Sequence, residues 1–248
     1  MALHKDAAIV LRRLDYSETS QVLVLFTRQH GCQRLIAKGI KRGTRSRVAV
    51  GLDLLEMGRV VFSQRSDKHD ALAVLTEWRQ EDHFPHLRDD LSRCYAAQYA
   101  AEVTSELTEP HDPHPALFDG LHRLLRDLEH TAALPGLVGY LWFLLREIGL
   151  RPDFSRCINC GRHPLDSAPV YFSAHKGGAI CRDCEPALVE KRRIDPLVAR
   201  ALTNGDAPGP ADAAQVFDVL DYHLRETMSR PARLSPFLRA ALGLPAKL

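Results

Sequence analysis

The sequence lacks an apolar run long enough to cross a membrane. A bilayer-spanning helix needs about 18 or more consecutive apolar residues, and the richest stretch, residues 134–150, is interrupted by a proline and two charged residues. Lys5 and Asp6 likewise interrupt any early apolar run. We therefore expect no signal peptide and a soluble, cytoplasmic protein with reduced thiols.

The sequence also lacks the common catalytic motifs. It contains no Gly-x-x-x-x-Gly-Lys-Ser/Thr phosphate loop, no His-Glu-x-x-His, no Gly-x-Ser-x-Gly, and no deaminase pattern of His-x-Glu followed by Pro-Cys-x-x-Cys. Carboxylates such as Asp89, Asp90, Asp218 and Asp221 fall on expected helix surfaces, where solvated charge explains them. These absences predict that the protein is not an enzyme.

Acidic residues are missing from one long stretch near the N-terminus. Residues 1–80 carry 14 Lys and Arg against 8 Asp and Glu, although the net charge of the whole chain is only +2. No acidic residue lies between Glu18 and Asp53, whereas seven cations do: Arg28, Arg34, Lys38, Lys41, Arg42, Arg45 and Arg47. A solvated basic face would explain scattered cations but not the missing carboxylates, so the pattern favours a polyanionic partner such as nucleic acid.

The first 80 or so residues have the alternation and turns of β-strands. The expected strands cover residues 7–11, 21–27, 33–38, a long strand over 52–62 that bends or bulges at Gly58, and 72–75. Strands this short need closure to hide their edges, which predicts a small five-stranded barrel. An oligonucleotide-binding (OB) barrel fits this pattern, and an SH3-like barrel is the structural alternative.

The pattern becomes helical from about residue 82. Leu91, Tyr95, Tyr99, Val103 and Leu107 recur every four residues and predict the buried stripe of a long helix. Further apolar stripes predict helices over residues 115–128, 137–148, 216–224 and 237–242, the last with Ser235 as its N-cap. The predicted class is α+β, with a barrel at 1–80, helical parts at 81–152 and 191–248, and an insertion at 153–190.

Two Cys-x-x-Cys knuckles define the insertion. The first knuckle is Cys157–Cys160 and the second is Cys181–Cys184, a spacing typical of a four-thiolate zinc site. Two disulfides or an iron–sulfur cluster are the alternatives, the first requiring an oxidising compartment and the second different spacings. Four thiolates leave no open position on the metal, so we expect one structural Zn²⁺.

Other residues near the knuckles have simpler explanations. His163 and His175 could be ligands only if a cysteine were displaced, and Cys32 and Cys94 are isolated in sequence and typical of small buried residues. The basic cluster Lys191–Arg193 follows the second knuckle, and a metal-anchored loop could present it to phosphates.

Several segments together resemble the RecO family of bacterial recombination mediators. They are Asp15–Ser20, Leu25–Thr27, Gly31, Ala37–Gly39 and Ser46 in the barrel, Phe143–Asp153 leading into the first knuckle, and Phe172–Ser173 with Gly177–Gly178 before the second. The order of barrel, helices, four-cysteine insertion and helices is similar too. Many members of that family have degenerate zinc cysteines, whereas this chain keeps all four.

The resemblance implies a nucleoid-associated DNA repair protein. Members of the family bind single- and double-stranded DNA, anneal complementary strands, and act with the ring-forming partner RecR to load the recombinase onto DNA coated by single-strand-binding protein (SSB). The resemblance also implies that the barrel is an OB fold in contact with DNA and RecR. We carry the DNA role only to cations on the matching barrel segment: Arg34, Lys38, Lys41, Arg42, Arg45 and Arg47.

The scarcity of aromatic residues suggests how DNA would be held. Residues 1–80 offer only Tyr16, Phe26, Phe62 and Trp78, and the two phenylalanines lie in apolar runs typical of core. We therefore expect binding through phosphates, with base edges left free. Two rivals remain open: a zinc-bearing adaptor that binds only protein, and a metal-dependent nuclease, against which the missing carboxylates argue.

Overall fold

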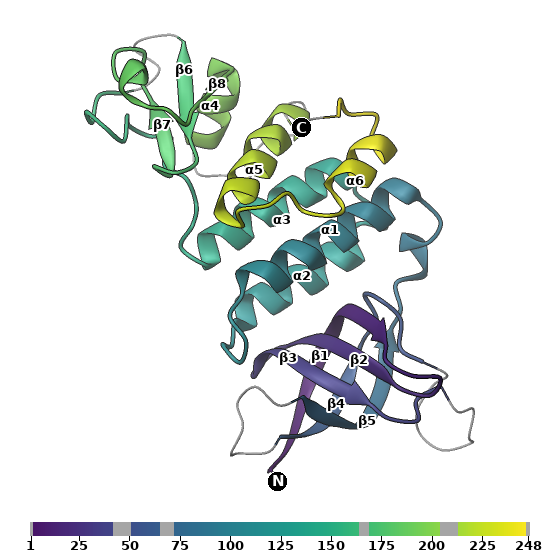
Figure 1. Ribbon diagram of the computed structural model, residues 1–248. Coiled ribbons are helices and arrows are strands. Elements are labelled where there is room, and N and C mark those ends of the chain that lie inside the picture. The colour runs from purple at the N-terminus through teal and green to yellow at the C-terminus, as the bar shows by residue number, and fades with distance from the viewer. Residues whose placement is uncertain (1, 42–50, 65–71, 164–168, 204–212, 247–248) are drawn as a thin grey trace. The chain divides into compact units, whose positions relative to one another are not determined.

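The computed structural model describes the chain except residues 1, 42–50, 65–71, 164–168, 204–212 and 247–248. It divides into two compact units, residues 1–129 and residues 130–248. The first unit holds five strands followed by two long helices, and the second holds further helices and a small sheet (Figure 1). Within the described residues, no helix is both long and apolar enough to span a bilayer.

The first unit begins with a closed five-stranded barrel in the order β1-β2-β3-β5-β4. Its strands are β1 (Ala2–Asp15), β2 (Gln21–Thr27), β3 (Gly31–Ala37), β4 (Met57–Gln64) and β5 (Ala73–Asp82). All neighbours are antiparallel except β3 and β5, whose parallel pairing closes the barrel. This is the five-stranded Greek-key arrangement of an OB fold, as predicted, and not an SH3-like meander.

The barrel interior is filled by apolar side chains that alternate along the strands. The buried set is Ala8, Val10, Leu23, Leu25, Leu35, Ala37, Ile40, Leu52, Val60, Phe62, Ala73 and Trp78. Phe26 is also buried, on the outer face of β2, where its ring lies 5.9 Å from that of Phe118. The prediction that Phe26 and Phe62 belong to the core is confirmed.

One strand prediction was wrong, and the first and last strands, expected over residues 7–11 and 72–75, are longer than predicted. Residues 52–56 form a turn rather than a strand, in which Leu55 has a φ of 68° and its N–H donates to Val10 O at 2.8 Å. The last strand extends to Asp82, well beyond the expected end at residue 75. Beyond Leu75 this strand buries only Trp78, so the sequence lacks the apolar alternation that would have revealed it.

A loop covers part of the β3 edge. His111 donates its backbone N–H to Cys32 O at 3.1 Å, and a side chain at Gly31 would collide with the backbone of Asp112. An uncovered edge would offer unpaired backbone groups to another chain. The loop therefore finishes the barrel where the parallel β3–β5 pairing does not reach.

The two long helices of the first unit are α1 (Leu91–Leu107) and α2 (Pro115–Asp127), preceded by the 3₁₀ turn η1 (Pro85–Leu87). Asp90 caps α1 by accepting the N–H of Arg93 at 2.8 Å. The predicted stripe of α1 is only partly correct, because Leu91 is 68% exposed and four alanines (Ala96, Ala97, Ala100 and Ala101) are buried instead. Helix α2 buries the predicted leucines.

The second unit contains α3 (Ala133–Glu147), a three-stranded sheet and three further helices. The sheet has the order β7-β6-β8, with β6 (Val170–Ser173), β7 (Gly178–Ile180) and β8 (Arg192–Ile194). The remaining elements are the 3₁₀ turn η3 (Glu185–Ala187), α4 (Pro196–Thr203), α5 (Ala213–Thr227) and α6 (Ser235–Ala241). Helix α5 packs on α3, so the chain returns to the earlier helix after the knuckles.

Two predictions about the C-terminal helices need correction. Leu234, not Ser235, is the N-cap residue of α6, and it makes no side-chain cap bond. Ser235 instead donates to the carboxylate of Asp221 on α5. His223, expected at the edge of a helix face, is 4% exposed and its Nε2 lies 2.9 Å from Leu150 O.

Candidate metal centre and nucleic-acid surface

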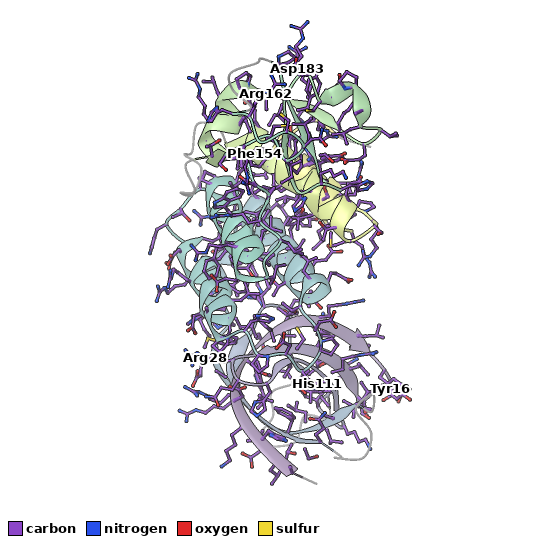
Figure 2. The ribbon with its side chains drawn as sticks, turned by 90° about the vertical axis from the view of Figure 1, so that its left-hand side faces the viewer. Tyr16, Arg28, His111, Phe154, Arg162 and Asp183 are labelled. Carbon is purple, nitrogen blue, oxygen red and sulfur yellow. The ribbon has the colours of Figure 1, made fainter. Side chains whose placement is uncertain are left out.

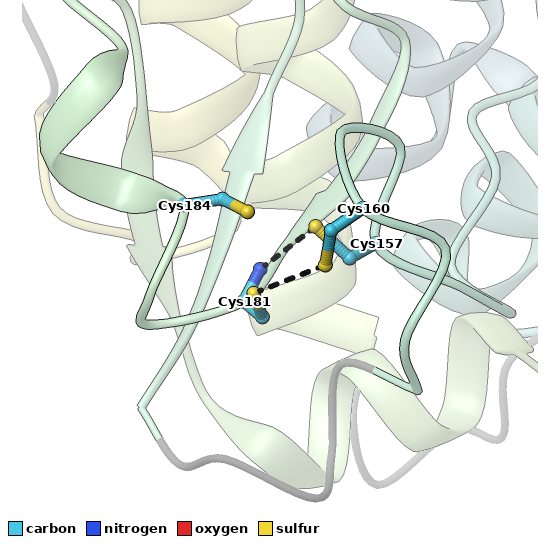
Figure 3. Close-up of side chains that lie close together, drawn as sticks. All are labelled: Cys157, Cys160, Cys181 and Cys184. Atoms are coloured by element: carbon cyan, nitrogen blue, oxygen red, sulfur yellow. Dashed lines mark hydrogen bonds between the residues drawn. The ribbon is translucent and has the colours of Figure 1, made fainter.

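The four knuckle cysteines converge on one point (Figure 3). The sulfurs of Cys157, Cys160, Cys181 and Cys184 all lie within 4.8 Å of one another, and Cys160 Sγ lies 3.7 Å from Cys181 Sγ. A tetrahedral Zn²⁺ with Zn–S bonds of about 2.3 Å has S···S edges of about 3.8 Å. The cysteines therefore form a group whose donor chemistry and spacing fit a closed zinc site.

Backbone hydrogen bonds build the first knuckle against β7. Ile158 donates to Ala179 O at 2.9 Å, and Ala179 donates to Asp153 O at 2.8 Å. The chain then turns at Gly161, which has a φ of +77° and donates to Cys157 O at 2.8 Å. Glycine adopts this left-handed conformation without steric cost.

The β7 strand must approach the first knuckle closely. A side chain at Gly178 would come within 2.7 Å of Asp153 O, so only glycine allows the two segments to pair. The second knuckle is a turn in which Cys184 donates to Cys181 O at 3.1 Å. The β6–β7 hairpin thus brings two knuckles that are distant in sequence to the same place.

The surroundings of the sulfurs change the pKa values of Cys160, Cys157 and Cys181 in different directions. Hydrogen bonds, first of all from the backbone N–H of Arg162, lower the pKa of the Cys160 thiol to about 6. Burial opposes ionisation of Cys157, yet backbone N–H groups of both knuckles lower its pKa overall. Burial above all, and then hydrogen bonds with the sulfurs of the other three cysteines, raise the pKa of Cys181 to about 12.

His175 and the two remaining cysteines make their contacts elsewhere. His175 contacts the carboxylates of Glu190 and Glu226 rather than the sulfurs. Cys32 is buried and its sulfur lies 3.1 Å from Thr108 Oγ1, whereas Cys94 is only half-buried and accepts from Gln98. With four sulfurs already together, the site has no need of a histidine ligand.

The predicted DNA-binding cations fall into three groups. Arg34 on β3 and Lys38 directly after it are exposed, and neither has an ion-pair partner among the residues that the structure describes. Lys41 is half-buried, and its Nζ lies 2.8 Å from Asp15 Oδ2. Arg42, Arg45 and Arg47 lie outside the described residues.

Carboxylates from other parts of the first unit therefore form ion pairs with two cations of the acid-free stretch. The Asp15 carboxylate that pairs with Lys41 has a lowered pKa, chiefly because of the hydrogen bond from that lysine. Arg28 is held in the same way, by a two-point pair with Asp119 on α2 at 2.8 and 2.9 Å. The unpaired positive charge in the described part of the stretch is thus concentrated at Arg34 and Lys38.

Tyr16 is the one exposed aromatic residue among the described part of residues 1–80. Its side chain is 67% exposed in the β1–β2 loop and projects from the barrel (Figure 2), whereas Phe26, Phe62 and Trp78 are at most 4% exposed. Loops of this type contribute to nucleic-acid binding in OB folds. The barrel consequently has little aromatic surface on which bases could stack.

An apolar row on the outside of the barrel was missed in the sequence. Leu14 pairs with Val22, Val22 with Ile36, and Ile36 with Val74, so the four side chains cross four strands side by side. Leu14 is 65% exposed and the others are half-buried. Apolar residues at outward as well as inward positions of β2 and β3 were the available signal, because a one-sided strand should alternate with polar residues.

The basic cluster after the second knuckle is mostly engaged internally. Lys191 pairs with Glu185 at 2.7 Å, and the Arg192 guanidinium lies 4.4 Å from the centre of the Tyr222 ring. Of the three, only Arg193 is exposed, and residues 192–194 form strand β8 instead of the expected loop. The hypothesis that a metal-anchored loop presents this cluster to phosphates is therefore corrected to one exposed arginine on a strand.

Comparisons with family models identify the proteins that combine an OB barrel, helices and a four-cysteine group beside a small sheet in this order. The model for the recombination protein O N terminal matches residues 1–84, and that for the recombination protein O C terminal matches residues 88–235. The chain therefore belongs to the recombination protein O (RecO) family, and its role lies in DNA repair and recombination.

Individual proteins of this family are similar to the chain over most of its length. The chain is 34% identical over 203 residues to the DNA repair protein RecO of Anaeromyxobacter dehalogenans (strain 2CP-C), covering 80% of this chain and 76% of that protein. It is 34% identical over 191 residues to the DNA repair protein RecO of Myxococcus xanthus, covering 74% of this chain and 73% of that protein. It is 28% identical over 200 residues to that of Halalkalibacterium halodurans, covering 80% and 76%.

Proposed function

We propose that this protein is a recombination mediator that binds single- and double-stranded DNA, anneals complementary strands and, with RecR, helps to load the recombinase onto SSB-coated DNA. In this proposal it is not an enzyme. The absence of catalytic motifs in the sequence supports that part of the proposal. So does the one clustered group of possible metal ligands among the described residues, because four cysteines leave no coordination position for water or substrate.

The observation that carries DNA binding is a pair of exposed cations, one on β3 and one directly after it. Arg34 and Lys38 lie in a segment without acidic residues, and the described residues offer neither of them an ion-pair partner. Cations that are not neutralised by the protein itself can replace the counterions condensed on a phosphate backbone. We propose that these two residues contact the sugar–phosphate chain.

A phosphate-based interface suits annealing. Phosphate contacts position a strand without reading its bases, and neutralising the backbone charge reduces the repulsion between two strands. With Tyr16 as the one exposed aromatic residue in the described part of residues 1–80, base edges remain free to pair with a second strand. Binding should therefore depend on salt and not on sequence.

Charge reversal tests the proposed interface. In the double variant Arg34→Glu, Lys38→Glu, we expect at least a tenfold loss of affinity for single strands, measured by fluorescence anisotropy. The negative slope of log K against log salt concentration should become less steep by about 1.4, because each phosphate contact on a single strand contributes about −0.7 to that slope.

Arg79→Glu is the matched control, since Arg79 is an exposed cation on a different strand of the same barrel. Annealing of SSB-coated strands, with and without RecR, should follow the same ranking. A folded double variant that binds DNA with unchanged affinity and slope would show that Arg34 and Lys38 are not the interface.

The apolar row supports a protein partner on the same barrel, which we propose is RecR. Interfaces between proteins combine apolar side chains at the centre with charged residues at the rim, and Arg12 flanks the row on β1, two residues before Leu14. Leu14→Ser should weaken the RecR complex by at least tenfold in a pull-down or calorimetric titration. Leu3→Ser is the control, because Leu3 is equally exposed at 65% on the same strand. Equal effects of both variants would reject this surface.

We further propose that the four cysteines bind one structural Zn²⁺. When bound, the metal supplies only cross-linking of the two knuckles, with no chemical step. Metal analysis should find one zinc per chain, and Cys157→Ser should lose the metal and lower the stability of the second unit. A metal-free wild-type protein would contradict the assignment.

A further inference from the structure

Tyr16 projects from the barrel on a turn whose shape is fixed by hydrogen bonds (Figure 2). Its N–H donates to Ser20 O at 3.0 Å, and the N–H of Ser17 donates to the same oxygen at 3.2 Å. The Ser17 hydroxyl oxygen accepts the N–H groups of Thr19 and Ser20 at 3.3 and 3.1 Å. None of these bonds uses the tyrosine side chain, so the turn presents an aromatic ring to solvent without needing the ring for its own shape.

The strand register places Tyr16 at the same end of the barrel as one of the proposed phosphate contacts. Asp15 pairs with Gln21, and Gln21 pairs with Ala37, so these three residues form a row across β1, β2 and β3. Tyr16 directly follows Asp15, and Lys38 directly follows Ala37. Because β1 and β3 run in the same direction on either side of β2, both residues leave the barrel at the same end.

Lys41 attaches the turn to the segment that follows β3. Its backbone N–H donates to Thr19 O in the turn at 3.3 Å, and its Nζ lies 2.8 Å from Asp15 Oδ2. Asp15 also accepts Nε2 of Gln21 at 3.3 Å. The turn that carries Tyr16 and the segment that carries Lys38 are thereby joined at their bases, and both side chains are exposed.

An exposed aromatic ring beside free cations is the combination that holds unpaired strands. A single exposed apolar residue needs no explanation by itself. Proteins that bind single strands, however, track the phosphates with cations and stack bases on aromatic rings, which tolerates every sequence because every base has a π-face. In a duplex the neighbouring base pairs cover those faces. The cations can therefore act on both kinds of DNA, whereas Tyr16 can act only on an unpaired base.

We propose that Tyr16 stacks on one base of a strand whose phosphates contact Lys38 and Arg34, and that this ring makes the barrel prefer single strands to duplex. The inference rests on the proposed DNA-binding function and deepens it, because it assigns the choice between the two kinds of DNA to one side chain. Stacking covers the face of a base and leaves its hydrogen-bonding edge exposed. The contact is therefore compatible with annealing to a second strand.

The test compares the affinity of the full chain for an oligothymidine strand with that for a duplex closed by a hairpin at each end, both measured by fluorescence anisotropy. Tyr16→Leu should lower affinity for the single strand by about 5- to 100-fold and leave affinity for the duplex within about twofold. Tyr16→Phe keeps the ring and should bind as wild type does. Phe237→Leu is the matched control, since Phe237 is an exposed aromatic residue of the second unit, at 55%.

Two further measurements separate stacking from contact with phosphates. A strand of abasic sites keeps its phosphates but has no bases, so wild type and Tyr16→Leu should bind it equally. The slope of log K against log salt concentration on the oligothymidine strand should be the same in wild type and Tyr16→Leu, because no phosphate contact is lost. A strand carrying 5-iododeoxyuridine should photocrosslink to Tyr16, as located by mass spectrometry.

The outcomes distinguish this inference from the proposed DNA-binding function. Unchanged single-strand affinity in Tyr16→Leu, or an equal loss for single strand and duplex, would overturn the stacking role. If the double variant Arg34→Glu, Lys38→Glu still lost affinity in that case, the phosphate contacts would stand without it. A wild-type protein that bound neither kind of DNA would remove both.

Discussion

At the scale of single residues, Glu190 organises the contacts between the small sheet and α5. Its carboxylate accepts a hydrogen bond from Ser173 Oγ at 2.6 Å. It accepts two further hydrogen bonds from the backbone N–H groups of Ala174 and His175, at 3.0 and 3.2 Å. It also accepts the hydroxyl of Tyr222 from α5. One acid thus fixes the turn between β6 and β7, and through that hairpin the second knuckle.

The ionisation of Glu190 predicts how stability depends on pH. Burial alone would raise its pKa, but the hydrogen bonds from Ser173, Tyr222 and the two N–H groups lower it below the ordinary value of 4.5. A carboxyl group with a lowered pKa in the folded state stabilises the fold at pH values above its unfolded pKa. That contribution is lost as the pH falls through the lower, folded pKa.

We therefore expect Glu190→Gln to lower the free energy of unfolding by about 1–3 kcal/mol at pH 7. The difference from wild type should shrink below pH 4.5 as wild-type Glu190 takes up a proton. Urea unfolding at pH 7, 5 and 3.5 measures it. A difference that is constant across this range would show that the charge of Glu190 contributes nothing and only the shape of the side chain matters.

The sequence predicted some residues and not others for a physical reason. The four cysteines were found because each knuckle is a local motif whose chemistry is independent of the rest of the fold. The contacts of Glu190 and the pairing of Lys41 with Asp15 depend on segments brought together by folding, and no spacing encodes them. His223 was misplaced for the same reason, since its partner is the carbonyl of Leu150, 73 residues away.

At the scale of elements, helix α1 shows where periodicity misleads. Its four-residue stripe of leucines, tyrosines and valine predicted the helix correctly but only part of its buried side. The described structure buries alanines together with Tyr99 and Val103, while Leu91 is exposed. Small residues allow close approach of neighbouring backbones, yet they add little to an apolar stripe, so periodicity favoured the larger side chains.

Strand β4 supports a sharper prediction at Gly58. The pairing of β4 with β5 shifts register between Met57 and Gly58, which confirms the predicted bulge. A side chain at Gly58 would approach the Trp78 ring to 2.8 Å and also collide with the backbone carbonyl of Arg79. The ring is part of the barrel core, so neither neighbour can move freely.

Gly58→Ala should therefore destabilise the barrel by about 1–3 kcal/mol through overpacking. Urea unfolding followed by circular dichroism measures the loss. Ser63→Ala on the same strand is the control and should change the free energy of unfolding by less than about 0.5 kcal/mol. If both variants unfold alike, the close approach at Gly58 is not a constraint.

At the scale of the whole molecule, the chain has two compact units with different sources of stability. The barrel of the first unit is closed by strand pairing around an apolar interior. The sheet of the second unit has only three strands of three or four residues each, and a sheet so small needs additional support. The four-cysteine group lies beside that sheet, so a bound metal would supply that additional support.

The two tryptophans allow this division to be tested in the full-length protein. Trp78 belongs to the first unit and Trp142 to the second, and both are 4% exposed. Trp78→Phe leaves a reporter for the second unit, and Trp142→Phe leaves one for the first. We expect a zinc chelator to lower the thermal midpoint reported by Trp142 by about 5 °C or more, because metal binding energy contributes directly to folding.

The midpoint reported by Trp78 should not move, and affinity for single-stranded DNA should stay within about threefold, because Arg34 and Lys38 belong to the first unit. Cys157→Ser should reproduce the effect of the chelator without any added reagent, which excludes a nonspecific action of the chelator. If both tryptophans reported the same shift, the two units would unfold as one cooperative body. Metal bound in the second unit would then stabilise the DNA-binding barrel as well, and loss of zinc would be expected to weaken DNA binding at elevated temperature.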